Sequence, residues 1–290
     1  MVKGEALPAD ASSAARWHPA VAPGLVLASS AIMYLGAALA VLLFAVANTG
    51  AVAWGRIGFA ALLLLLWRRP RIQPRYLPRI AVFGLALTGM NVLFYFAISM
   101  VPLGSAVAVE FLGPVVLAAL RGHGVRTRIA VLFGLLGVFL ISWEGVRGHA
   151  ETLIGMSFAL AAGALWAVYI WLGERVATTA ATGVDSLALG MGIGALVLSP
   201  LVIGRIDPFV EHPVNILLIL LVALFSSVLP YALDMVLLSR IPATTYAVLT
   251  ALFPATSLLV GLVMLRQVPT LPEVLGLAMV SVAVWLAACD

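Results

Sequence analysis

The stretch FAISMVPLGSAVAVEFLGP, residues 96–114, is apolar throughout except for one carboxylate, Glu110, and a few small polar side chains. A second stretch, VLLSRIPATTYAVLTALFP at residues 236–254, has the same frame of two prolines but carries Thr250 where the first has the acid. In each stretch the prolines are twelve residues apart, and the two frames are offset by 140 residues. The pattern indicates that the chain is built from two copies, of which only the first has an ionisable group at this position.

The composition is that of a polytopic membrane protein. Of the 290 residues, 63% are hydrophobic and 10% are charged, and the mean hydropathy is +1.16. So little charge would not solvate the surface of a soluble domain. The apolar runs are continuous rather than alternating, which excludes a transmembrane β-barrel. The single cysteine, Cys289, excludes an intramolecular disulfide and a cysteine metal site.

A bilayer core of about 30 Å needs about 20 apolar residues per helix, and the apolar runs predict ten such helices. The predicted spans are 22–47, 51–67, 79–100, 104–120, 129–146, 152–174, 185–204, 213–237, 242–265 and 271–289. The first run is too long for a cleavable signal, so residues 1–21 are predicted to be an N-terminal tail. The sequence therefore predicts an all-α membrane protein with ten transmembrane helices.

The basic residues predict the orientation. With a cytoplasmic N-terminus, 12 lysines and arginines fall on the cytoplasmic side and 3 on the outside. Because short cytoplasmic loops carry an excess of Lys and Arg, both termini are predicted to be cytoplasmic. The formal net charge of +4 then reflects membrane topology, and no nucleic-acid partner is expected.

The copies, residues 22–146 and 152–289, each contain five predicted spans. Five is an odd number, so the second copy must enter the membrane in the opposite sense. Inverted repeats of this kind are typical of transporters that work by alternating access, with the substrate site at the repeat interface near the midplane.

Three ionisable residues within the predicted spans stand out: Arg56, Glu110 and Asp234. A charge at a helix centre costs about 2.5–3.5 kcal/mol, so each is a candidate functional residue. The topology places Arg56 and Glu110 at similar depth, where they can pair, with Asn91 nearby. Three interpretations stay open: a structural ion pair, an Arg56 that extends to the outer headgroups without a partner, and a direct role in handling substrate or protons.

Asp234 lies near the cytoplasmic end of its span, with Tyr231 on the same helix face. It is either an interfacial carboxylate near Arg240 or a group that recruits substrate or binds a proton. Pro230 removes a backbone hydrogen bond just before Tyr231 and predicts a break in this span.

Aromatic and amide side chains complete the candidate site. Asn91 and Tyr95 are four residues apart, and Trp166 and Tyr169 three, so each pair is predicted to share a helix face. These faces and Tyr34 either line a cavity or serve ordinary helix packing.

No catalytic residue, metal site or cofactor is predicted. The four histidines, His18, His123, His149 and His212, fall in the tail or in loops on both sides of the membrane. The sequence also has no phosphate-binding glycine motif.

Three stretches resemble a known family: GMNVLFYFAISMVPLGSAVAVEFLGPVVLAAL (89–120), GALWAVYIWLGERV (163–176) and LPYALDMVLLSRIPATTYAVL (229–249). They are similar to the EamA family of the drug/metabolite transporter superfamily, and within it to the threonine and homoserine exporters. The resemblance covers the chain from about residue 22 onward. It implies two inverted five-helix repeats around a central cavity, in the bacterial inner membrane, and export of amino acids and related metabolites.

The favoured hypothesis is an exporter of small neutral amino acids such as threonine or homoserine. Glu110 or Asp234 would receive the substrate ammonium, while Arg56, Asn91 and tyrosine hydroxyls would receive its carboxylate. One alternative is a broad-specificity exporter of aromatic amino acids, drugs or metabolites, with Trp166, Tyr169 and Tyr231 as walls. A more distant alternative is a membrane enzyme or lipid-handling scaffold. The sequence leaves monomer and homodimer open.

Overall fold

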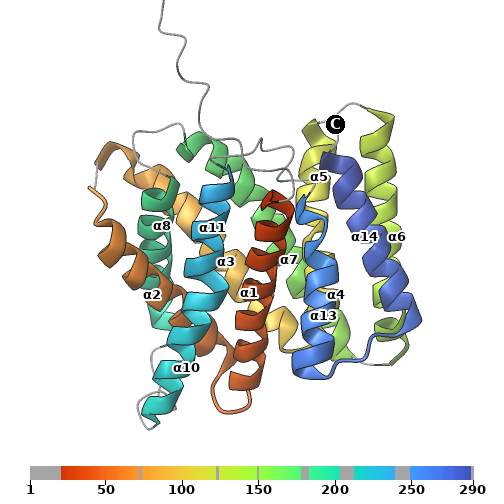
Figure 1. The fold of residues 1–290 in the computed structure, drawn as a ribbon, viewed down its shortest axis with the longest axis horizontal. Helices are drawn as coiled ribbons and strands as arrows, with labels where there is room; N and C mark the ends of the chain where they lie inside the picture. Colours follow the sequence, from red (N-terminus) through yellow and green to blue (C-terminus); the bar gives the residue numbers. More distant parts are fainter. Residues whose placement is uncertain are drawn as a thin grey trace, which may run out of the picture.

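A computed structural model describes residues 21–71, 74–121, 124–148, 150–177, 183–202, 212–238 and 249–288. These residues form a bundle of helices joined by short turns and linkers (Figure 1). In chain order the elements are α1 (Val21–Leu43), α2 (Thr49–Arg68), η1 (Pro74–Tyr76), α3 (Leu77–Ile98), α4 (Leu103–Glu110), α5 (Leu112–Arg121), α6 (Val125–Gly148), α7 (Ala150–Ala177), α8 (Gly183–Leu198), η2 (Ser199–Leu201), α10 (Pro213–Ala223), η3 (Leu224–Val228), α11 (Leu229–Leu238), α13 (Phe253–Leu265) and α14 (Leu271–Ala288).

Where the structure describes them, the predicted spans lie on one helix or on consecutive helices. The span predicted at 104–120 is divided into α4 and α5, and the span at 213–237 into α10, η3 and α11. The first part of the span at 242–265, including Pro242, lies outside the described residues, as do residues 1–20 of the predicted tail. The start of α1 and the end of α14 lie at the same end of the bundle (Figure 1).

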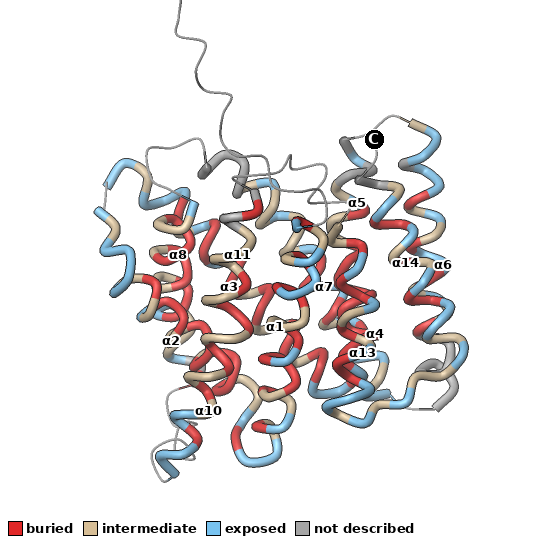
Figure 2. Tube along the Cα trace, in the orientation of Figure 1, coloured by how far each residue is buried: buried red, intermediate tan, exposed pale blue. Residues whose placement is uncertain are grey.

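The core of the protein lies along the central helices. In Figure 2 buried stretches follow the middle of these helices, while exposed stretches lie at the helix ends and on the outer faces. Ile57, Leu87, Tyr95 and Leu103 are among the largest side chains that are fully buried. Many of the largest buried side chains therefore come from α2, α3 and α4, which also carry four of the nine predicted site residues.

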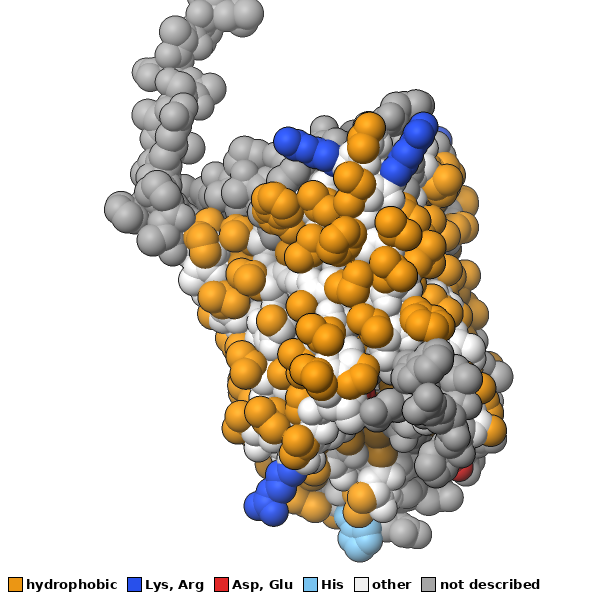
Figure 3. Space-filling view, turned by 90° about the vertical axis from the view of Figure 1, so that its right-hand side faces the viewer, with side chains coloured by type: hydrophobic (Ala, Val, Ile, Leu, Met, Phe, Trp, Pro, Cys, Tyr) orange, Lys and Arg blue, Asp and Glu red, His pale blue; other side chains and the backbone are white. Residues whose placement is uncertain are grey.

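The outer surface is apolar. Hydrophobic side chains cover most of the face seen in Figure 3, and the Lys and Arg side chains visible there lie at its two ends. Five helical segments are long and apolar enough to cross a membrane: Val21–Leu43, Thr49–Arg68, Pro74–Ile98, Ala150–Leu172 and Pro213–Asp234. Five shorter segments are also apolar: Leu103–Leu117, Arg128–Ile141, Gly183–Leu198, Phe253–Leu265 and Leu271–Leu286. Length and composition thus mark the described chain as a membrane protein.

The helix neighbours correspond when the two halves of the chain are exchanged. α3 packs against α7 and α8, whereas α11 packs against α1 and α10 against α2. Similarly, α4 packs against α7 and α13 packs against α1. Exchanging the first five predicted spans with the last five, in order, converts each of these contacts into its counterpart. The packing therefore has a two-fold pattern.

Glycines permit the closest helix contacts. A Cβ atom on Gly84 of α3 would collide with the carbonyl oxygen of Gly190 on α8, and one on Gly194 would collide with the Thr88 hydroxyl. On α6 and α14, a Cβ on Gly137 would lie 2.7 Å from the Gly276 carbonyl oxygen. At these crossings the backbones approach too closely for any side chain, as is common in membrane helix packing.

Two prolines interrupt helices four residues after a polar residue of the site. Pro114 has no N–H to donate to the Glu110 carbonyl, and α4 ends at Glu110. Pro230 likewise cannot donate to the Ser226 carbonyl, and Ser226 lies in the single π-helical turn η3. Both interruptions place a site residue at a local change in helix geometry.

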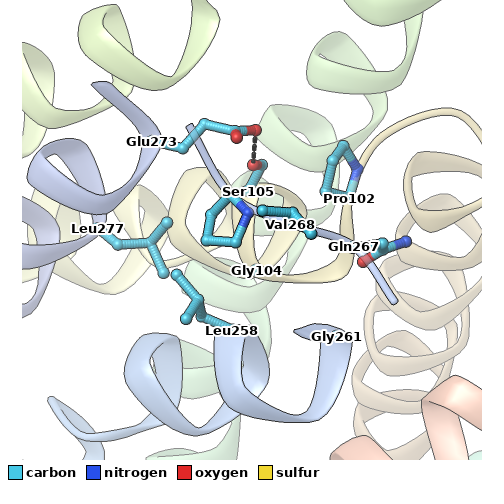
Figure 4. Close-up of a pocket in the computed structure, with 10 residues that line it drawn as sticks. Pro102, Gly104, Ser105, Leu258, Gly261, Gln267, Val268, Glu273 and Leu277 are labelled. Carbon is cyan, nitrogen blue, oxygen red and sulfur yellow. Dashed lines mark hydrogen bonds between the residues drawn. The ribbon is translucent and has the colours of Figure 1, made fainter. Parts of the chain in front are cut away.

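The first turn of α4 is held by the segment that joins α13 to α14. The Leu103 amide donates to Gln267 Oε1 at 3.0 Å, and the Ser105 hydroxyl donates to Glu273 Oε1 at 2.9 Å (Figure 4). Glu273 also accepts from the Thr270 amide at 2.9 Å, which caps the start of α14. Ser105, Gln267 and Glu273 border a small pocket between α4, α13 and α14.

Substituting Gly84 by Ala should destabilise the protein, since the added methyl group must push α3 away from the α8 backbone. Overpacking of this kind costs about 1–3 kcal/mol. A lower unfolding temperature in detergent than that of the unaltered protein would reveal the loss.

Gly58→Ala on α2 is the matched control, because nothing lies within 4 Å of a Cβ built there. It should leave the unfolding temperature unchanged or raise it slightly. Equal unfolding temperatures for the two variants would show that the α3–α8 crossing tolerates a side chain.

Candidate functional site

The nine predicted site residues come from six helices that meet in the interior of the bundle. Tyr34 lies on α1, Arg56 on α2, Asn91 and Tyr95 on α3, Glu110 on α4, Trp166 and Tyr169 on α7, and Tyr231 and Asp234 on α11. Each of them interacts with another polar or aromatic side chain of the interior. The interaction is a hydrogen bond, a ring contact or an electrostatic effect between two groups.

Arg56 is the centre of a hydrogen-bonded network. Its Nη1 atom donates to the Tyr95 hydroxyl at 3.4 Å and to Ser226 Oγ at 3.2 Å, and its Nη2 atom donates to Asn91 Oδ1. The guanidinium carbon also lies 4.8 Å from the centre of the Tyr95 ring, in cation–π geometry. Asn91 and Tyr95 therefore share a helix face, as predicted, and both use it to hold Arg56.

The structure contradicts two interpretations of Arg56. The side chain is only 4% exposed, so it does not extend to the membrane surface. It also forms no ion pair with Glu110 among the described residues. Instead, Asn91, Tyr95 and Ser226 bind its two Nη atoms, so Arg56 is held by neutral oxygen atoms. Its Nε–H group is buried and has no hydrogen-bond partner among the described residues.

Glu110 occupies the last turn of α4, directly against α7. The backbone of Gly163 lies so close that a Cβ atom there would collide with the Glu110 carbonyl oxygen. Among the described residues no hydrogen bond or ion pair reaches the Glu110 carboxylate. The Glu110 carboxyl and the Arg56 guanidinium thus lie in one interior, and among the described residues neither has a partner of opposite charge at contact distance.

Asp234 is tied to α1. The Ser29 hydroxyl donates to Asp234 Oδ1 at 3.0 Å, and it also lies 3.5 Å from the Pro230 carbonyl oxygen. The charges of Asp234 and Glu110 both act on the Tyr34 hydroxyl, and the charge of Asp234 acts on Tyr169. Asp234 therefore belongs to the same interior as Glu110. Arg240, its predicted neighbour, lies outside the described residues.

Tyr231 connects the two ends of the polar interior. It interacts with the Asn91 side chain and is influenced by the charges of Arg56, Asp234 and Glu110. Applying the proline offset of 140 residues aligns Tyr231 with Asn91 in the two copies. The two predicted copies thus place a matching pair of positions, Asn91 and Tyr231, close together in the interior.

The two aromatic residues of α7 have different neighbours. The Trp166 ring packs edge-on against Phe111, with centroids 4.6 Å apart, whereas Tyr169 stacks on Phe83 at 4.8 Å. Phe253 also contacts both Phe111 and Tyr34 edge-on. Trp166 therefore belongs to an aromatic wall beside Glu110, made by Tyr34, Phe111, Trp166 and Phe253.

Sequence reasoning missed Ser29, Ser226 and the aromatic partners Phe111 and Phe253. Serine and phenylalanine are ordinary residues in apolar helices, so neither type was a signal by itself. Only Pro230 could have drawn attention to Ser226, which precedes it by four residues. In the described part of the chain, no group of three or more His, Cys, Asp or Glu could hold a metal ion.

Known proteins are similar to this chain in sequence and in fold. The EamA-like transporter family matches residues 153–289. The threonine/homoserine exporter RhtA of Escherichia coli (strain K12) is 33% identical over 271 residues, which cover 92% of this chain and 90% of that protein. RhtA of Salmonella typhimurium (strain LT2) is 35% identical over 272 residues, with the same coverage.

A solved crystal structure superposes with a TM-score of 0.57 at 18% identity, covering 91% of this chain and 96% of that one. At this identity the likeness concerns the fold alone. The RhtA relatives, by contrast, share a third of their residues with this chain over nearly its whole length. By that measure the chain belongs to the EamA family of membrane transporters.

Proposed function

We propose that the protein exports small neutral amino acids, such as threonine and homoserine, across the bacterial inner membrane. Two relatives of similar length are named threonine/homoserine exporters, which supports this substrate class. The observation that carries the proposal is the buried guanidinium of Arg56, whose partners Asn91, Tyr95 and Ser226 are all neutral. A buried cation held in this way is suited to receive a carboxylate.

Glu110 is the complementary group for the substrate ammonium. A zwitterion needs one anionic and one cationic or donor-rich partner, and the Glu110 carboxylate has no hydrogen-bond or ion-pair partner in the described part of the chain. Asp234, by contrast, already accepts a hydrogen bond from Ser29. Glu110 is therefore assigned to the ammonium and Arg56 to the carboxylate. Neutralising both charges in one complex would offset the cost of burying them.

Transport would proceed by alternating access between two inverted five-helix repeats, with both termini cytoplasmic and the site near the membrane midplane. The two-fold pattern of helix contacts supports the repeat. The start of α1 and the end of α14 lie at one end of the bundle, which supports placing both termini on one side (Figure 1). The excess of Lys and Arg on that side of the predicted topology supports a cytoplasmic location.

The aromatic wall favours a second candidate, a broader exporter that also accepts aromatic amino acids. Phe111 directly follows Glu110 in the chain and packs against Trp166, so these rings would face the side chain of a bound amino acid. Aromatic rings pack favourably against such walls. The two candidates differ in substrate range and share the same site for the ammonium and carboxylate groups.

Arg56→Gln and Glu110→Gln should each reduce threonine uptake into proteoliposomes roughly tenfold or more, because losing a hydrogen bond to a charged group costs about 1.5–3 kcal/mol. The matched controls are Arg68→Gln and Glu151→Gln, which remove charges at the partly exposed Arg68 and the exposed Glu151. Uptake by Arg56→Gln equal to that of Arg68→Gln would contradict the proposed site.

Competition should define the substrate range. Unlabelled homoserine should inhibit the uptake of labelled threonine strongly, and phenylalanine should inhibit it weakly, if the site is built for small side chains. Inhibition by phenylalanine but not by homoserine would overturn the narrow range and favour the broader exporter.

A transmembrane pH gradient should accelerate threonine flux if a coupled proton travels on Glu110. A zwitterion has no net charge, whereas one coupled proton adds about 2.3 kcal/mol per 100 mV of membrane potential. The acceleration should be present in the unaltered protein and absent in Glu110→Gln. Flux that does not respond to the gradient would mean facilitated diffusion without proton coupling.

A further inference from the structure

The π-helical turn η3 (Leu224–Val228) interrupts the span formed by α10 and α11. The Leu229 amide bonds to the Leu224 carbonyl, five residues back, instead of to the carbonyl four residues back. Pro230 explains the change, because it cannot donate to Ser226 and the helix must locally rearrange. Single π-helical turns inside α-helices frequently occur at functional sites.

The Ser226 hydroxyl in this turn has a fixed direction. It donates to the Val222 carbonyl at 2.7 Å and accepts from Arg56 Nη1 at 3.2 Å. Because its one proton is engaged by Val222, the hydroxyl can only be an acceptor toward the guanidinium. A neutral acceptor of fixed direction orients the cation without cancelling its charge.

Asn91, like Ser226, donates to a carbonyl of its own helix and accepts from Arg56. Its Nδ2 atom donates to the Leu87 carbonyl, four residues back, at 2.7 Å, which turns Oδ1 toward Arg56 Nη2. Ser226 and Val222 are also four residues apart. The guanidinium is therefore held at both Nη atoms by acceptors that are each locked to their own helix, one in each half of the chain.

The backbone around Ser226 has little room to move. Gly36 of α1 lies against it so closely that a Cβ atom on Gly36 would be 2.6 Å from the Ser226 amide nitrogen. Ser226 itself is 2% exposed. The position of its hydroxyl is thus determined by packing as well as by hydrogen bonds.

We propose that Ser226 is a positioning residue that holds the Arg56 guanidinium in the orientation that receives the substrate carboxylate. The inference rests on the proposed function, since it assigns the carboxylate to Arg56. The π-helical turn in the second half of the chain fixes this orientation through Ser226, and Asn91 fixes it from the first half.

The test compares Ser226→Ala with Ser227→Ala in proteoliposomes. Both serines are buried in the same turn, but in the described structure the Ser227 hydroxyl has no hydrogen-bond partner. Ser226→Ala should raise the KM for threonine roughly tenfold, as expected for losing a hydrogen bond to a charged group, with kcat nearly unchanged. Ser227→Ala should leave both constants unchanged, and both variants should unfold near the temperature of the unaltered protein.

Threonine methyl ester separates positioning from general damage, because it keeps the ammonium but has no carboxylate charge. It should inhibit the unaltered protein and Ser226→Ala with equal potency, whereas a structural defect would weaken its inhibition as much as threonine transport.

Equal KM values for the two serine variants, or a parallel loss of ester inhibition, would overturn the role of Ser226 and leave the proposed function intact. An unaltered protein that transports none of the tested amino acids would overturn the proposed function and this inference together.

Discussion

The guanidinium of Arg56 lies in the interior of a helix bundle, where an isolated ion is costly to keep. Its hydrogen bonds go to Asn91, Tyr95 and Ser226, which satisfy donors but supply no negative charge. Much of the surrounding structure follows from this requirement. α3 must present an amide and a hydroxyl on one face, and a helix of the second half must turn a serine toward the same point.

Backbone groups face the same constraint as side chains, because in an apolar environment each unpaired carbonyl is expensive. Pro114 and Pro230 each remove the donor for a carbonyl four residues earlier, at Glu110 and at Ser226. At Glu110 the glycine backbone of α7 closes over the freed carbonyl. At Ser226 the helix changes to a π-helical turn. The two prolines therefore create local irregularities in the helices that carry the polar site. Close packing of neighbouring helices limits how far these irregularities can extend.

The sequence predicted the helices well because a bilayer demands long apolar runs, and it identified Arg56, Glu110 and Asp234 because charges in such runs are rare. One of its three interpretations of Arg56, an ion pair with Glu110, is absent from the described structure, since depth along two helices says nothing about which faces point toward each other. The true partners of Arg56 include Ser226, and serine is too common in apolar helices to be a signal. Trp166 and Tyr169 were placed on one face by spacing alone, yet Phe111 and Phe83 draw them to different neighbours.

The first turn of α4 depends on residues that are synthesised much later. The Leu103 amide is capped by Gln267, and Ser105 bonds to Glu273, both from the segment around the start of α14. During synthesis the helix that carries Glu110 therefore stays incomplete until the last two helices are in place. A chain that ended before Gln267 would leave the first turn of α4 without this cap.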